Sequence, residues 1–209
     1  MSDSTPASNS LFSKHRLEAL SDGVFAVVMT LLVLELKPDL PPRSDHAAVA
    51  LALHELARPL AGYAFAFAIT GVFWTLHHRK FSLLRQTDGP HTVLTLTFLF
   101  AVTLLPLSVS IYLKTKTVGL AQAVFFGNSA FIALTLLASW LYAKRRGLAD
   151  SATVPDVAAQ LTRGMAAMGA AGLISCVAAL VGQQWLFLLI VPVMLWARRR
   201  RASAPPAAS

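Results

Sequence analysis

Long runs of uncharged residues are the feature that most constrains the fold of this chain. The longest extends from Gly164 to Ala197, 34 residues without a charged side chain. A helix of that length would measure about 51 Å at 1.5 Å per residue, whereas the hydrocarbon core of a bilayer is only about 30 Å thick. The run is therefore too long for one crossing. The sequence Gly-Gln-Gln at 182–184 is where we expect it to divide into two spans.

Four further apolar segments precede this run. They are Leu17–Leu36, Leu60–Leu76, Thr92–Leu113 and Val118–Ala143. Hydrophobic residues make up 56% of the chain and charged residues 13%, which is not the composition of a water-soluble domain. The fold class that we predict is an all-α membrane protein with six transmembrane helices. The amphipathic stretch at 47–59 is either an interfacial helix or the beginning of the second span.

The basic residues indicate the orientation of the six spans. If the N-terminus is cytoplasmic, 13 of the 18 Lys and Arg residues fall in cytoplasmic segments, the side on which positive charge is enriched. Both termini are then cytoplasmic. We assign residues 14–201 to one six-helix domain and expect disordered cytoplasmic tails at 1–13 and 202–209. The net charge of +8 is explained by this distribution and by contact of Arg198–Arg201 with anionic membrane lipid, so nucleic acid is not an expected partner.

The first apolar segment has two different faces. At 100° per residue, Val27, Thr30, Leu31 and Leu34 lie within one arc of about 120°, and Asp22 lies on the opposite side of the helix. The aliphatic stripe is compatible with a surface that faces lipid, packs against another helix or lines an axis of symmetry. Helical periodicity does not choose among these three.

Asp22 is the unusual residue of this segment, because an acid within a membrane is costly and usually has a polar partner. It could instead be solvated at the interface or cap a helix. Partners are available on the same side of the membrane in Arg16, Ser21 and His77, and we expect a hydrogen-bonded group that holds the helix in place. Trp74 and His77 share one side of the second span at a spacing of three residues.

The sequence contains no recognisable enzyme motif. We find no nucleophile elbow, no phosphate-binding glycine loop and no paired catalytic carboxylates, so we expect neither an enzyme nor a bound cofactor. His77 and His78 are adjacent and about 100° apart on a helix, which is a poor geometry for sharing a metal ion. No metal site is therefore expected.

The stretch RLEALSDGVFAVVMTLLVLEL at 16–36 resembles the first-helix signature of the transmembrane protein 175 family, the bacterial relatives of the lysosomal potassium channel. That signature is Arg, three residues, then Phe-Ser-Asp; Leu20 stands here in place of the Phe. The matching residues are Arg16, Ser21 and Asp22. The sequence FWTLHH resembles the family's Trp and His at the end of the second helix, here Trp74 and His77.

The resemblance implies a homotetrameric potassium-selective cation channel in the cytoplasmic membrane of a prokaryote. In this family the first helix lines a central pore that has no carbonyl selectivity filter and is narrowed by rings of aliphatic side chains. Carried over, the rings are Val27, Leu31 and Leu34, with Val27 the narrowest, and Thr30 is a polar layer that favours potassium. The implied partners are three further copies of the chain, membrane lipid and permeant monovalent cations, with K⁺ as the permeant ion.

Two other functions remain open at this point. The first is a secondary transporter for a small cation or organic solute, and the second is a non-conducting membrane scaffold. Transporters usually have broken helices at mid-membrane, whereas the first span has no Gly or Pro between Val24 and Leu34, which favours a channel.

Overall fold

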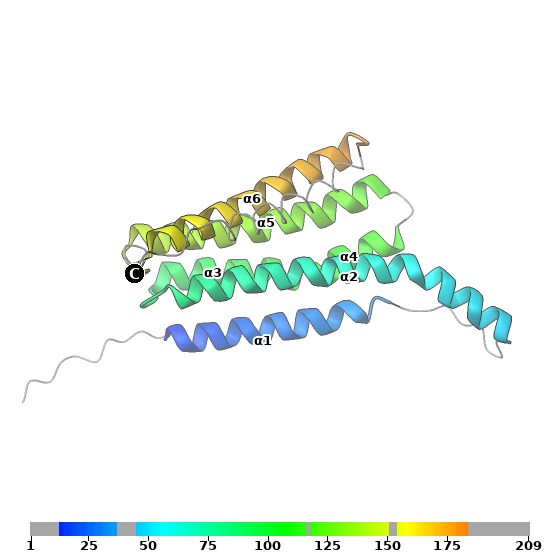
Figure 1. Ribbon diagram of the computed structural model, residues 1–209, viewed down its shortest axis with the longest axis horizontal. Helices are drawn as coiled ribbons and strands as arrows, with labels where there is room; N and C mark the ends of the chain where they lie inside the picture. The colour runs from blue at the N-terminus through cyan, green and yellow to red at the C-terminus, as the bar shows by residue number, and fades with distance from the viewer. Residues whose placement is uncertain (1–12, 37–44, 116–117, 151–153, 184–209) are drawn as a thin grey trace, which may run out of the picture.

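The computed structural model describes residues 13–36, 45–115, 118–150 and 154–183, and this part of the chain is helical. The helices are α1 (Lys14–Val33), α2 (His46–Ser82), α3 (Gly89–Thr103), α4 (Leu105–Lys114), α5 (Val118–Arg145) and α6 (Pro155–Leu180). They lie roughly alongside one another (Figure 1). Within these residues, four segments are long and apolar enough to cross a membrane: α2, α3 together with α4, α5 and α6. The chain is thus a multi-pass, all-helical membrane protein. The predicted sixth span and both predicted tails, except Ser13, lie outside the described residues.

The second helix is longer than its predicted span. α2 continues for 37 residues through Pro59, so the amphipathic stretch at 47–59 forms its first part. This first part extends beyond the end of the bundle in Figure 1. The third predicted span is divided at Leu104, where α3 ends and α4 begins. Pro106 lies in the first turn of α4, a position that needs no backbone N–H donor.

Glycine determines where α5 and α6 end. Gly147 follows α5 with a φ of 66°, and Gly182 follows α6 with a φ of 81°. After α6, the N–H of Gln183 donates to the carbonyl of Ala178 and the N–H of Gly182 donates to that of Ala179. This pattern is the Schellman motif, in which glycine adopts the left-handed conformation without steric cost. The break expected at 182–184 is therefore present.

The start of α6 differs from the sequence prediction. The predicted span begins at Gly164, where the uncharged run starts, whereas the helix itself begins nine residues earlier at Pro155. Proline is favoured in the first turn of a helix, and Asp156 interacts well with the positive end of the helix dipole. The polar first turns therefore extend the helix beyond its apolar segment.

The core of the bundle lies between α2, α3 and α5, and it contains large aromatic residues such as Phe73, Phe98 and Trp140. α1 packs against α2, α3 and α4. α5 and α6 pair closely on the side of the bundle opposite α1 (Figure 1). One side of α1 is thus covered by its own chain, and the other is left at the edge of the subunit.

Candidate functional site

The two faces of α1 have opposite environments in the folded chain. One face is buried against α2, α3 and α4, and it consists of Leu17, Ser21, Phe25, Val28 and Leu32. The aliphatic stripe is on the other face, where the exposed fractions are 56% for Val27, 41% for Leu31 and 60% for Leu34. A membrane protein exposes such a surface to lipid, to another subunit or to a pore. The stripe therefore lies largely outside the packed core of its own subunit.

Thr30 lies within the exposed stripe, and its hydroxyl is oriented by the helix itself. Its Oγ1 is 2.8 Å from the carbonyl oxygen of Val27 and 3.1 Å from that of Ala26. A hydroxyl has one donor and two acceptor lone pairs. Because the proton is used in a bond to the backbone, the lone pairs remain available to a donor or a cation outside the helix.

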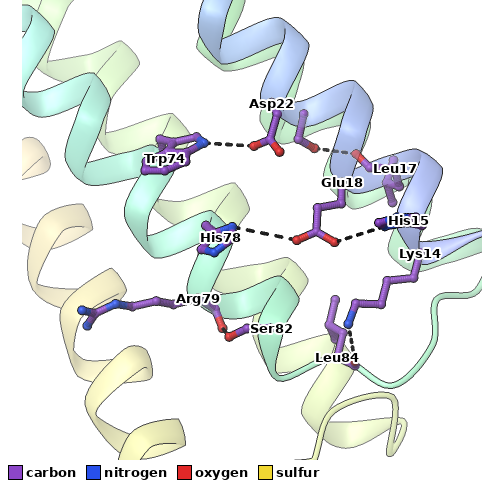
Figure 2. Close-up of polar contacts among 11 residues, drawn as sticks. Lys14, His15, Leu17, Glu18, Asp22, Trp74, His78, Arg79, Ser82 and Leu84 are labelled. Carbon is purple, nitrogen blue, oxygen red and sulfur yellow. Dashed lines mark hydrogen bonds and ion pairs between the residues drawn. The ribbon is translucent and has the colours of Figure 1, made fainter.

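Asp22 contacts the neighbouring helix through Trp74. The indole Nε1 of Trp74 donates to Oδ1 of Asp22 at 3.0 Å (Figure 2). This bond joins α1 to α2, two helices that are neighbours in the bundle. A hydrogen bond to a carboxylate is stronger than one between neutral groups, so it is well suited to fix the position of α1.

The other residues expected near Asp22 have different surroundings. Ser21 is fully buried, and its hydroxyl donates to the carbonyl of Leu17 on its own helix at 2.8 Å. Arg16 is exposed, and its backbone N–H bonds to Ser13. His77 is 1% exposed within an aromatic cluster. Its ring stacks on Phe98 with centroids 4.9 Å apart and lies 4.5 Å from Phe81.

α1 and α2 also meet at a second contact, which was not predicted from the sequence. Nδ1 of His78 lies 3.9 Å from Oε1 of Glu18, and the His78 ring stacks on Trp74 with centroids 5.6 Å apart (Figure 2). Glu18 precedes Asp22 by four residues, and His78 follows Trp74 by four. Since residues four apart share one side of a helix, two acids on α1 face two aromatic donors on α2. The spacing of four residues in both pairs is the sequence pattern from which this contact could have been predicted.

Lysines hold both ends of α1. Nζ of Lys14 donates to the carbonyl of Leu84 at 2.7 Å, at the end where α1 begins (Figure 2). At the other end, Nζ of Lys114 on α4 is 2.9 Å from Oε2 of Glu35. Together with the bond between Asp22 and Trp74, these contacts attach α1 to its own subunit at its beginning, in its first half and just beyond its end.

Lys80 is a basic residue in the last turn of α2. It is fully buried, and its Nζ donates to Oγ of Ser139 at 2.9 Å and lies 4.8 Å from the centroid of the Phe81 ring. A buried ammonium is stabilised by hydrogen bonds and by the faces of aromatic rings. In the described residues, no group of three or more His, Cys, Asp or Glu side chains is arranged to hold a metal ion.

Comparisons with known proteins point to one family. Residues 16–106 match the family model described as endosomal/lysosomal potassium channel TMEM175. A potassium channel from Streptomyces collinus is 32% identical over 161 residues, which are 75% of this chain and 77% of the relative. The endosomal/lysosomal proton channel TMEM175 of cattle is 36% identical over 102 residues, 46% of this chain but 21% of its own length.

Solved structures have a similar arrangement of helices. A lysosomal potassium-selective channel TMEM175 homolog from Chamaesiphon minutus matches with a TM-score of 0.66 at 27% identity, over 88% of this chain and 97% of that one. A variant of the potassium channel MtTMEM175 matches with a TM-score of 0.63 at 19% identity, over 90% and 94% of the two chains, which is a likeness of fold alone.

Proposed function

Because the chain belongs to the TMEM175 family, we propose that it is a cation channel that conducts potassium across the cytoplasmic membrane of a prokaryote. The observation that carries this proposal is the similarity to the Streptomyces potassium channel over three quarters of both chains. The family is one of ion channels, so the chain is not an enzyme.

In the proposed assembly, four copies surround a central axis and the α1 helix of each copy lines the pore. The exposed side of α1 supports this arrangement, because Val27, Leu31 and Leu34 are left uncovered while the residues on the opposite side are buried in the subunit. A fourfold axis next to this side would place four copies of each aliphatic residue in a ring.

The proposed gate is formed by these aliphatic rings. A narrow pore lined by alkyl groups expels water. An ion that entered this dry region would lose its hydration shell, and the energetic cost of that loss prevents it from crossing. Opening then requires α1 to rotate or move outward until water enters. Thr30 would supply hydroxyl oxygens between the rings of Val27 and Leu31, where its lone pairs could replace part of the hydration of a potassium ion.

The contacts between α1 and its own subunit would set the resting position of the gate. Asp22 bonds to Trp74, and lysines attach the two ends of α1. A movement of α1 that widens the pore must lengthen or break some of these contacts. In this proposal the acid positions the pore helix and does not touch the ion. Both termini are cytoplasmic, as the distribution of Lys and Arg suggests.

The test is ion flux in liposomes that contain the purified protein. We expect potassium to leave potassium-loaded vesicles down its gradient, at a rate that exceeds sodium flux and rises with protein density. Slow, saturable uptake that requires a counter-ion would instead identify a secondary transporter. Flux equal to that of empty vesicles would identify a non-conducting protein.

A further inference from the structure

A large cavity lies apart from α1, beside Pro59 of α2. It has a volume of about 780 Å³ and lies between α2, α4 and α5. That volume is within the range of cavities that hold small molecules, about 300–1,000 Å³. None of the proposed pore residues lines it. The cavity is therefore a second feature of the fold, independent of the proposed gate.

The rim of the cavity carries two opposite charges. Glu55 and Arg58 lie three residues apart on α2, and both are exposed. Within the part of the chain that the structure describes, neither forms an ion pair with the other or with a third residue. Lys114 is also on the rim, but its ammonium is bonded to Glu35 and to Ser110. The free charges of the rim are thus one carboxylate and one guanidinium.

The interior of the cavity is mainly apolar. Phe65, Val109, Phe125 and Phe126 contribute the apolar lining. Gln122 is 5% exposed, and its Oε1 is buried without a hydrogen-bond donor in the described residues. Because almost none of its surface is accessible, this oxygen does not face the cavity, and a molecule in the cavity would contact the apolar lining.

The depth of the cavity in the membrane indicates the kind of molecule. Lys114 is the last residue of the membrane-capable segment formed by α3 and α4, and Arg58 just precedes the predicted span of α2. The charged rim is therefore at the level where the apolar segments end, which is where lipid headgroups lie. A lipid places its charges at this level and its acyl chains deeper.

We propose that the cavity binds a zwitterionic phospholipid with a primary ammonium group, of the phosphatidylethanolamine type. The Arg58 guanidinium binds the phosphate, as its fork of N–H donors does well. The ammonium has three N–H donors and binds the Glu55 carboxylate. Apolar parts of the lipid contact the aromatic lining. The trimethylammonium of phosphatidylcholine cannot donate, so it makes no hydrogen bond to Glu55.

The test is lipid binding to the delipidated full-length protein in detergent, measured by native mass spectrometry with dioctanoyl lipids. We expect phosphatidylethanolamine to bind more tightly than phosphatidylcholine or phosphatidylglycerol. Arg58→Gln should weaken its binding about tenfold, the usual effect of losing one charged hydrogen bond. Arg145→Gln is the matched control, because it removes an exposed arginine at the opposite end of α5 and should leave binding unchanged.

A further variant tests the role of the acid. Glu55→Gln should reduce the preference for phosphatidylethanolamine over phosphatidylglycerol and over phosphatidylcholine, because a neutral amide is a weaker acceptor for the ammonium. An unchanged preference over both lipids would contradict the role of Glu55.

Several results would overturn the proposal. Tighter binding of phosphatidylglycerol would make the site one for anionic lipid, and equal binding of soluble phosphoethanolamine would make it a site for a solute. If Arg58→Gln and Arg145→Gln weakened phosphatidylethanolamine binding equally, the binding would depend on the overall charge of the protein and not on this site. Because each readout is lipid binding, these results are independent of whether the protein conducts ions.

Discussion

The substitution of two adjacent valines on α1 distinguishes its two faces. Val28 is 2% exposed and packed inside the subunit, whereas Val27 is 56% exposed. Changing either one to alanine removes the same two methyl groups. If the stripe lines a pore, Val28→Ala should change stability and Val27→Ala should change ion flux. The shared chemistry of the two variants makes each the control for the other.

The size of the stability effect follows from packing. The unfolded reference state of a membrane helix remains in an apolar environment, so the transfer of methyl groups out of water contributes little. A cavity of one methyl group costs about 1 kcal/mol, and hence Val28→Ala should cost about 2 kcal/mol. For a chain of this size, 1 kcal/mol corresponds to about 2–4 °C. We expect the melting temperature to fall by about 4–8 °C, and by much less in Val27→Ala.

For ion flux, the larger effect is expected at Val27 and the smaller one at Val28. Val27→Ala widens the narrowest proposed ring and should raise potassium flux through resting channels in liposomes. Val27→Leu narrows the same ring and should lower it, while Val28→Ala leaves flux per folded channel near the wild-type value. Equal destabilisation by the two alanine substitutions, or a rise in flux from Val28→Ala alone, would refute the assignment of the two faces.

Two other predictions follow from particular contacts. Asp22→Asn and Trp74→Phe should each lower thermal stability and assembly more than ion selectivity, because the first removes the charge of the acceptor and the second removes the donor. In the double variant the losses of stability should fall short of additivity by about 1 kcal/mol, because both changes act on the same hydrogen bond; strictly additive losses would contradict this. In α6, a Cβ at Gly172 would lie 3.0 Å from the backbone of Ala130, so Gly172→Ala should cost about 1–3 kcal/mol, measured by thermal unfolding. In the control Gly164→Ala, the new Cβ meets only a side chain at 3.6 Å, so the variant should gain up to about 1 kcal/mol of stability from helix propensity. Equal losses of stability in the two variants would refute the close contact at Gly172.

The features that the sequence predicts well are those determined by local geometry. The aliphatic stripe of α1 follows from the 3.6-residue period, and the structure places it opposite the buried face. The end of α6 follows from Gly182, since glycine readily adopts a positive φ. Long apolar segments likewise indicated helices because a membrane leaves few alternatives for backbone hydrogen bonds.

The features that the sequence does not predict depend on how the helices are rotated against one another. His77 and His78 differ by about 100° on α2, and only the packing of α2 on α1 decides which of them meets Glu18. The burial of Lys80 depends on Ser139, 59 residues later in the chain. The cavity near Pro59 requires three helices in place, so no single stretch of sequence indicates it.

Thiol labelling of α1 tests most directly whether its exposed stripe lines the pore. Leu34→Cys and Leu32→Cys are introduced separately in a Cys176→Ala background, and potassium flux in liposomes is measured before and after a charged, water-soluble thiol reagent. Leu34 is 60% exposed at the end of the stripe, and Leu32 is fully buried on the opposite face. We expect the reagent to block flux through Leu34→Cys channels and to leave Leu32→Cys channels conducting. Unchanged flux through fully labelled Leu34→Cys channels would contradict this expectation.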